Sequence, residues 1–226
     1  MEKAFLSLLV LVRVLGSFGQ QGSGLAGKQL VFPQASNSAH VVLKAAPKWP
    51  LTSFTLCLAH FTDLNHPHTF FSYATRGSFN EIILLKEKNN VYGFAVGNEA
   101  VTFTDPEKKS LGRETLCATW DSATGLAELW VNSKRMPRKG LRKGYSISGE
   151  PSIVLGQEQD MMGGGFDIND CFVGELQDVR MWDRVLSSEE LELAFLNQDI
   201  PGDYVFDWKT VDYEIKGYVI VNPVAY

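Results

Sequence analysis

The chain has 226 residues, with 21 Lys and Arg against 26 Asp and Glu, which gives a formal net charge of −5 at pH 7. Without a basic excess there is little to neutralise phosphates, so we expect no nucleic-acid partner. A chain of this length can form one domain if it is all-β.

Residues 1–19 have the layout of a secretory signal. The segment has a charged start, an apolar run over residues 4–12 and a small residue at Gly19, which predicts cleavage after Gly19. Arg13 cuts the apolar run short of the ~20 residues that a membrane-spanning helix needs. No second run is long enough to cross a bilayer, so we expect a secreted protein with no membrane insertion and one mature domain over residues 20–226.

Short apolar or alternating runs, separated by Gly, Pro and Asn, recur along the mature chain. Such runs predict many short strands, and therefore a sandwich or barrel. Residues 121–125, DSATG, predict a hairpin turn between two of them. The predicted strands are KQLVFP, HVVLKA, SFTLCLAHF, TFFSYAT, NEIILLKEK, VYGFAVG and AVTFT in the first half, and ETLCATW, LAELWVN, GYSIS, SIVLGQ, FVGELQDVRMW and DYEIKGYVIV in the second.

Three cysteines remain once the signal is removed: Cys57, Cys117 and Cys171. In an oxidising compartment two of them should pair and one is left over. Cys57 and Cys117 lie in strand-like segments of similar pattern, and a bond between them would close a loop of about sixty residues. Cys171 is then an odd thiol, for which a buried small residue is favoured over a link between subunits.

Two features raise the question of catalysis or zinc binding. His60, His66 and His68 cluster in AHFTDLNHPH. That segment has no nearby cysteine and has a proline between two of the histidines, so a polar hairpin loop is favoured over a zinc site. No Gly-x-Ser-x-Gly motif is present to expose a serine nucleophile.

The segment LGQEQDMMGGGFDIND holds four carboxylates and three consecutive glycines. Glu158 and Asp160 would share a strand face, like the paired acids of a glycosidase, but no third acid follows at strand spacing, so we expect no enzyme. Calcium fits better, because it takes about six to eight oxygens from carboxylates, amides and main-chain carbonyls. The glycine run would let the chain reverse and return Asp167 and Asp170 to the ion. The alternative is a solvated acidic loop.

One segment breaks the strand pattern. In VLSSEELELAFLNQ, Ser187 stands three residues before Glu190, the spacing of a capping box. Leu191 and Phe195 follow at helical spacing and would lie on one apolar face. The pattern predicts a single helix over about 188–197, packed on a sheet.

The segment CATWDSATGLAELWVN resembles the signature of the pentraxins, which runs His-x-Cys-x-Ser/Thr-Trp-x-Ser/Thr. Cys117, Thr119, Trp120 and Ser122 match this signature, whereas the histidine position holds Thr115. FSYAT, KGYSISGEPSIVLGQEQD and FVGELQDVRMWDRVLS are similar to the same family in the same order. The resemblance implies a two-sheet antiparallel jelly-roll sandwich of the lectin-like kind, with one α-helix and one disulfide, in agreement with the cysteine pairing favoured above.

The resemblance also implies a homopentamer whose subunits each bind up to two calcium ions on one face, and ligands that attach through those ions. Phe79 is the main departure, because relatives carry Asp at this position, so we expect one ion to bind more weakly. Asp167 and Asp170 stand where relatives usually carry Glu and Gln. The implied metal ligands are Asn80, Glu158, the carbonyl of Gln159, Asp160, Asp167 and Asp170.

Phosphocholine binders of the family line a pocket with an aromatic residue, a threonine and a glutamate. The corresponding positions hold Leu85, Ala95 and Ala100, with Glu99 one residue away and facing the other side. A quaternary ammonium needs an aromatic face or an acid, and this pocket supplies neither, so phosphocholine is not the expected ligand. The resemblance implies a calcium-dependent protein of innate immunity that engages phosphorylated or polysaccharide ligands on microbial or damaged-cell surfaces. The alternative is a pentameric structural or interaction protein with weakened calcium and ligand binding.

Overall fold

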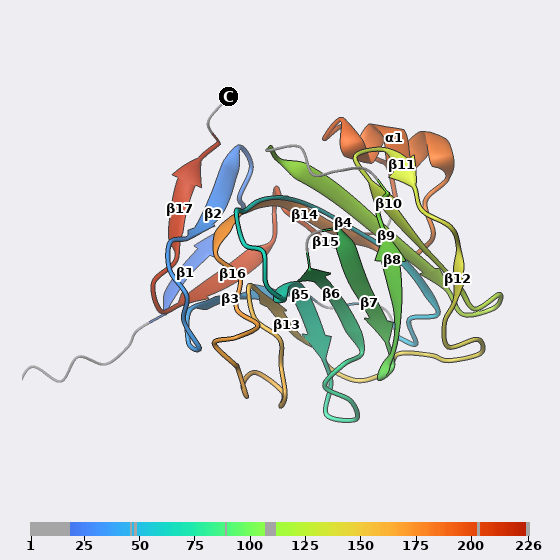
Figure 1. Ribbon diagram of the computed structural model, residues 1–226, viewed down its shortest axis with the longest axis horizontal. Helices are drawn as coiled ribbons and strands as arrows, with labels where there is room; N and C mark the ends of the chain where they lie inside the picture. The colour runs from blue at the N-terminus through green and yellow to red at the C-terminus, as the bar shows by residue number, and fades with distance from the viewer. Residues whose placement is uncertain are drawn as a thin grey trace, which may run out of the picture.

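The computed structural model describes residues 19–224 except residues 46, 48, 89, 107–111 and 203. The predicted signal therefore lies outside the described residues, apart from Gly19. Two antiparallel sheets pack face to face, and one helix lies on the outside (Figure 1), so the predicted fold is confirmed. Within the described ranges no helix is long and apolar enough to cross a membrane.

The eight-stranded sheet takes its strands from the whole length of the chain. These are β1 (Gln20–Ser23), β3 (His40–Lys44), β5 (His68–Ala74), β6 (Ile82–Lys88), β7 (Val91–Val96), β8 (Glu99–Thr104), β13 (Ser152–Leu155) and β16 (Asp212–Lys216). Their order across the sheet is β1-β16-β3-β13-β5-β6-β7-β8.

The nine-stranded sheet faces it. Its strands are β2 (Lys28–Phe32), β4 (Ser53–Phe61), β9 (Glu114–Asp121), β10 (Leu126–Val131), β11 (Lys134–Arg135), β12 (Lys139–Gly140), β14 (Gly174–Trp182), β15 (Tyr204–Asp207) and β17 (Ile220–Pro223). The main order is β11-β10-β9-β4-β14-β2-β17, with β12 paired to β10 and β15 paired to β14.

Alternate side chains of both sheets point inward and form one hydrophobic core, as the period of two along a strand requires. Phe54 of β4 lies 5.8 Å from Trp120 of the same sheet and 6.0 Å from Phe94 of the opposite sheet, measured between ring centroids. These aromatic contacts join the two layers.

Two predicted strands differ in the structure. GYSIS, residues 144–148, forms a turn with one isolated bridge, because Arg142 and Gly144 take φ values of 47° and 80°, which interrupt an extended chain. DYEIKGYVIV is divided into β16 and β17 by a turn at Gly217, whose φ is 69°. A Cβ at Gly217 would lie 2.9 Å from the Cα of Ala39, so this turn needs glycine.

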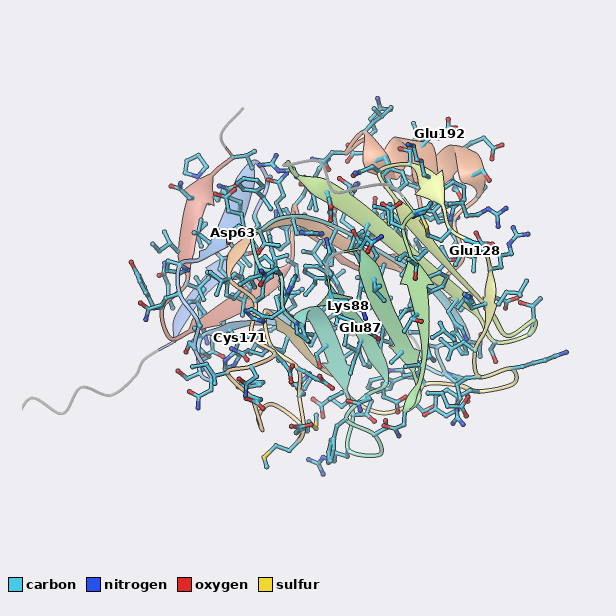
Figure 2. The ribbon with its side chains drawn as sticks, viewed as in Figure 1. Asp63, Glu87, Lys88, Glu128, Cys171 and Glu192 are labelled. Atoms are coloured by element: carbon cyan, nitrogen blue, oxygen red, sulfur yellow. A yellow bond between two sulfur atoms is a disulfide. The ribbon has the colours of Figure 1, made fainter. Side chains whose placement is uncertain are left out.

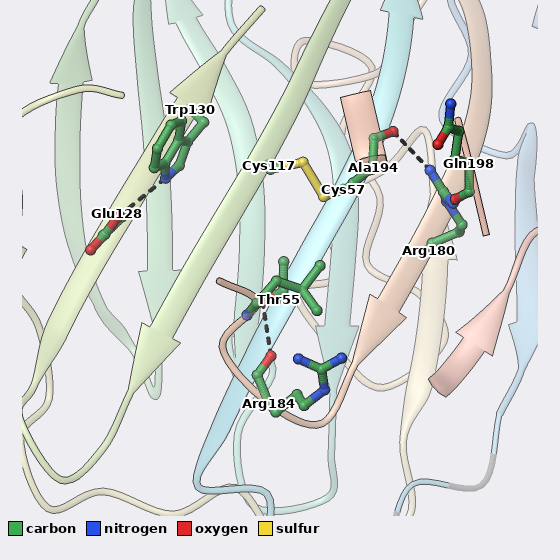
Figure 3. Close-up of a disulfide and its surroundings, with 10 residues drawn as sticks. Thr55, Cys57, Cys117, Glu128, Trp130, Arg180, Arg184, Ala194 and Gln198 are labelled. Carbon is green, nitrogen blue, oxygen red and sulfur yellow. Dashed lines mark hydrogen bonds between the residues drawn. A yellow bond between two sulfur atoms is a disulfide. The ribbon is translucent and has the colours of Figure 1, made fainter. Parts of the chain in front are cut away.

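The predicted helix is present as α1 (Ser188–Phe195). Ser187 and Glu190 form the capping box, and the apolar face is buried against the outer side of the nine-stranded sheet. Helix α1 has no basic residue in its last turn. Positive charge comes instead from Arg180 of β14, whose guanidinium donates at 2.9 Å each to the carbonyl of Ala194 in the last turn and to that of Gln198 just beyond the helix (Figure 3).

The disulfide joins Cys57 to Cys117, as predicted. The two residues (Figure 3) are direct partners in the β4–β9 ladder. They belong to the cluster of buried residues that also contains Trp182, Leu186 and, from α1, Leu191. Cys171 is a free, buried thiol, as the favoured interpretation of the odd cysteine expected.

A charged cluster lies between the sheets. Lys86 and Tyr92 of the eight-stranded sheet both donate to Oε2 of Glu114 in β9, at 2.9 and 2.8 Å. Nε2 of His60 in β4 lies 3.2 Å from the same oxygen. Burial alone would raise the pKa of Glu114, but the bonds from His60 and Lys86 outweigh it and hold the pKa at about 2.

His68 lies beside this cluster, with its ring 5.2 Å from Phe70 and 5.9 Å from Phe172 between centroids. Burial, opposed by the bond between Nδ1 and the carbonyl of His66, lowers the pKa of His68 to about 3, and the charges of His60 and Lys86 act in the same direction as burial. The imidazole is therefore neutral in the folded protein at physiological pH.

Acidification should destabilise the protein through His68. Because its folded pKa is about 3 and its ordinary value is 6.5, the unfolded chain binds a proton between these values that the folded chain does not. The contribution of His68 to the free energy of unfolding is complete above pH 6.5. It should fall by about 1.4 kcal/mol per pH unit as the pH drops from 6.5 towards 3. Urea unfolding at pH 7, 6 and 5 measures the slope. His68→Phe should reduce the slope of the unfolding free energy against pH by about 1.4 kcal/mol per pH unit. The slope that remains includes His40, whose pKa burial also lowers. An unchanged slope in His68→Phe would contradict the lowered pKa of His68.

Candidate calcium and ligand site

Two loops carry the predicted metal ligands. One joins β5 to β6 and the other joins β13 to β14, and Figure 1 shows both at the lower edge of the view, on the side of the molecule away from α1. The first loop carries Asn80, and the second carries all the other predicted metal ligands.

Gln159 fixes the acidic loop to the sheet. Its Nε2 donates to the carbonyls of Ser72 and Ser152 at 3.1 and 3.0 Å, and its Oε1 accepts from the amide of Gly163 at 2.8 Å. The side chain of Gln159 is therefore used structurally, which leaves its carbonyl as the group that the resemblance assigned to calcium. The residue is buried, and this part of the loop doubles back over β5 and β13.

Asn80 presents an unusual oxygen. Its Oδ1 is buried and has no hydrogen-bond partner among the described residues. The main chain around it is fixed, because its carbonyl accepts from the amide of Asn98 at 3.0 Å. The next residue, Glu81, is buried, and its carboxylate accepts from Tyr145 Oη at 2.8 Å and from Thr75 Oγ1 at 3.2 Å. An orphaned buried acceptor costs free energy unless a ligand satisfies it.

The carboxylates of the acidic loop are close enough to repel one another. Burial, and then the charges of Asp170 and Asp160, raise the pKa of Glu158. Burial, followed by Asp167 and Asp160, likewise raises the pKa of Asp170, against a small opposite effect of His66. A cation placed among these groups would relieve the repulsion.

The set is not assembled into a closed cage. Over the described part of the chain, no three or more His, Cys, Asp or Glu side chains are grouped so that they could hold a metal ion. Asp167 is partly engaged elsewhere, because its Oδ1 accepts from the main-chain amide and the side-chain amide of Asn169 at 2.9 and 2.8 Å. The donors present are all oxygens, which suits calcium.

The predicted pocket residues Leu85, Ala95 and Ala100 share the outer face of the sheet. Ser72, Ile83, Ala95 and Ala100 are successive partners in one row across β5 to β8, and Leu85 faces Gly93 in the next row. Glu99 pairs with Val96, which points into the core, and its carboxylate accepts from Arg142 Nη1 at 3.0 Å. Glu99 therefore lies on the opposite side of β8 from Ala100.

The structure adds residues that the sequence did not reveal. Glu87 lies on β6 and is labelled in Figure 2. A Cβ at Gly93 would lie 3.3 Å from Oε1 of Glu87 and 2.7 Å from Cδ1 of Leu85. An acid therefore lies two residues beyond Leu85 on the same face. Glu81 and Tyr145, which position Asn80, are 64 residues apart in the chain, and no local pattern links them.

A two-sheet antiparallel sandwich with an oxygen-rich loop over one outer face defines a lectin-like binding protein. The Pentaxin family profile matches residues 28–223, and the chain belongs to this family. This confirms the resemblance found in the sequence, and it makes the chain a binding protein and not an enzyme.

Relatives match over nearly the full length. The chain is 43% identical over 223 residues to C-reactive protein of Sus scrofa (99% of this chain and 98% of that protein). It is also 43% identical over 223 residues to mucosal pentraxin of Bos taurus (99% of each) and 40% identical over 226 residues to serum amyloid P-component of Bos taurus (100% of each). The crystal structure of a native heptameric SAP-like pentraxin from Limulus polyphemus matches with a TM-score of 0.79 and 24% identity, covering 88% of this chain and 96% of that one, and confirms the fold.

Proposed function

We propose that the chain is a secreted, calcium-dependent pattern-recognition protein that engages phosphorylated or polysaccharide ligands. The proposal is carried by the buried, unpartnered Oδ1 of Asn80, together with an acidic loop whose carboxylates repel one another. Both features disfavour the empty site and favour a bound cation.

The residues that would hold calcium are Asn80, Glu158, the carbonyl of Gln159, Asp160, Asp167 and Asp170. When bound, the ion supplies positive charge and open coordination positions for ligand oxygens. The protein's own residues orient these donors: Gln159 anchors the acidic loop to β5 and β13, and the amide of Asn98 fixes the main chain at Asn80. The aliphatic floor at Leu85, Ala95 and Ala100 favours ligands recognised through their oxygens over quaternary amines.

A second candidate function is a structural or interaction protein with weakened calcium binding. The observation that favours it is the exposed Phe79, which cannot coordinate an ion, together with the lack of a closed carboxylate cage in the described ranges. The two candidates differ in whether the loop binds calcium at all.

Calcium titration of the mature protein should distinguish them, with Phe79→Asp as the test variant. We expect wild type to bind one calcium ion well. Phe79→Asp should raise the affinity for a second ion by about ten-fold, because the new carboxylate supplies the missing charged ligand. Phe79 is 42% exposed, so the change should not disturb the core. Phe79→Leu is the matched control and should behave as wild type.

The outcomes separate clearly. If neither wild type nor Phe79→Asp binds calcium, the calcium-dependent function is wrong and the interaction protein is favoured. If both bind calcium but a glycan array shows no hit that a chelator removes, calcium has a structural role only.

Self-association is part of the proposed function. We infer a homopentamer, the assembly that the family resemblance implies; the Limulus relative is heptameric. Native mass measurement of the secreted protein gives the subunit number directly, and a monomer would exclude avidity as the source of ligand affinity.

A further inference from the structure

His68 is a buried titratable residue at the start of β5, and the proposed function does not use it. The residue is only 1% exposed. Its Nδ1 lies 2.7 Å from the carbonyl oxygen of His66, which can only accept, so Nδ1 carries the proton and Nε2 keeps a free lone pair. Nε2 is buried and has no hydrogen-bond partner among the described residues. A second proton must therefore bind at a nitrogen that water does not reach.

The groups that face His68 oppose that second proton. Burial is the largest cause of its low pKa; the bond to the carbonyl of His66 opposes burial, and the charges of His60, Lys86 and His66 act with it. Glu114 of β9 is the acid of this cluster, and its Oε2 is already bonded to Lys86 and to the tyrosine of β7. A proton on Nε2 would add a cation to a buried site that already holds one.

The acidic loop begins and ends beside this imidazole. The amide of Gly156 donates to the carbonyl of Phe70 at 3.2 Å, and the amide of Phe172 donates to the carbonyl of Gly156 at 3.0 Å. The ring of Phe172 lies 5.7 Å from that of Phe70 and 5.9 Å from the imidazole of His68, measured between centroids. Both ends of the loop over residues 157–171 are therefore tied to one point of β5, two residues from His68.

The start of β5 is the weakly held part of that strand. The β5–β6 ladder shifts register at Phe70, which forms a β-bulge, so that the pairs of His68 and Thr69 lie beyond it at the end of the ladder. The pairing of β5 with β13 ends at Phe71. A ladder interrupted so close to its end opens at lower cost than its centre. The preceding residues 62–67 are mostly exposed, so water reaches the imidazole once the strand end moves.

We propose that His68 is the latch of an acid-sensitive switch: a proton on Nε2 favours an open form in which the start of β5 separates from Phe172, so that both ends of the acidic loop lose their anchor. In neutral surroundings the uncharged imidazole keeps the latch closed. In acid the open form gains a proton that the closed form excludes, so the open population rises. The latch itself needs no calcium; only its consequence, release of a bound ligand, rests on the proposed function.

Amide hydrogen exchange tests the latch, in the presence of a chelator so that no bound cation contributes. In peptides that contain Gly156 and Phe172, the open population should rise about thirty-fold between pH 7.5 and pH 5, after correction for the exchange rate of an unstructured amide at each pH. The factor follows because the open form binds a proton with the ordinary pKa of 6.5, whereas the pKa of His68 in the closed form is about 3. These amides should also exchange faster than those of the central β4–β9 ladder, which report global unfolding.

Two kinds of variant make the test specific. His68→Phe removes the titrating group and should abolish the rise in the open population. His68→Gln also does not titrate, and it replaces His68→Phe if the phenyl ring prevents folding. The matched control is His66→Phe, which removes an exposed imidazole two residues away and should keep the full rise.

Each outcome decides for or against the latch. A rise of the same size in the His68 variants would assign the acid response to the loop carboxylates and overturn the proposal. Equal exchange rates in the loop peptides and in the β4–β9 ladder would show that acid acts only through global unfolding, and would also overturn it. Calcium titration at pH 7.5 tests the proposed function separately, because the exchange experiment contains no free calcium.

Discussion

Glu114→Gln should lower the free energy of unfolding by about 3 kcal/mol, because it removes the negative charge that the buried ammonium of Lys86 contacts at 2.9 Å. The carboxylate accepts from Lys86 and Tyr92 and lies beside His60, so three groups from both sheets depend on it. The side chain of Lys86 is only 1% exposed, so water cannot replace the lost partner. Urea unfolding at pH 7 gives the difference.

Two further variants make this test specific. Lys86→Met combined with Glu114→Gln removes both charges and should recover most of the loss, since a neutral pair in this position carries no uncompensated charge. Glu128→Gln breaks the ion pair with Arg138, whose side chain is 52% exposed, and should cost less than about 1 kcal/mol. Equal losses in Glu114→Gln and Glu128→Gln would show that the buried cluster contributes no more than a surface pair.

Replacing both Cys57 and Cys117 with alanine should lower stability by about 4 kcal/mol, the chain-entropy value for a loop of this length. The sequence separation is 60 residues, so the unfolded chain gains much freedom when the bond is lost. The cavity beneath α1 adds to the cost, because both sulfurs pack against Trp182 and Leu191.

The control for the disulfide is Cys171→Ala, which removes a buried thiol but no crosslink. It should cost about 1 kcal/mol. Thermal unfolding of the three proteins under non-reducing conditions checks both values. A disulfide variant as stable as Cys171→Ala would mean that strain in the native bond offsets its effect on the unfolded chain.

Much of the fold could be predicted because its signals are local. In the core strands, apolar side chains alternate along the sequence as they alternate between the two faces of the sheet. The capping box at Ser187 and Glu190 predicted the start of α1, and the predicted end is two residues beyond the observed one. The strand β1, QQGS, was missed because it has no apolar alternation. It is held by backbone pairing to β16 at the sheet edge, and a backbone ladder leaves no side-chain pattern to detect.

The site could be predicted only in part. The acidic loop is one continuous stretch, so its carboxylates are visible together in the sequence. Asn80 was added to the predicted ligands only through the family resemblance, because it lies on a separate loop, between β5 and β6. The charged cluster between the sheets was not expected: Lys86 and Glu114 are 28 residues apart, and each occupies an ordinary position in its own strand. Their pairing depends on sheet packing, which no local pattern encodes.

The disulfide has a topological consequence for the ligand face. Residues 57–117 form a closed covalent ring that contains β5, β6, β7 and β8, and with them Asn80 and the floor at Leu85, Ala95 and Ala100. A protease that cuts one peptide bond inside this ring opens it without releasing a fragment. Such a nicked subunit would keep its full mass until a reductant separates the two pieces, so the ligand-bearing hairpins tolerate a single cleavage that would divide an uncrosslinked chain.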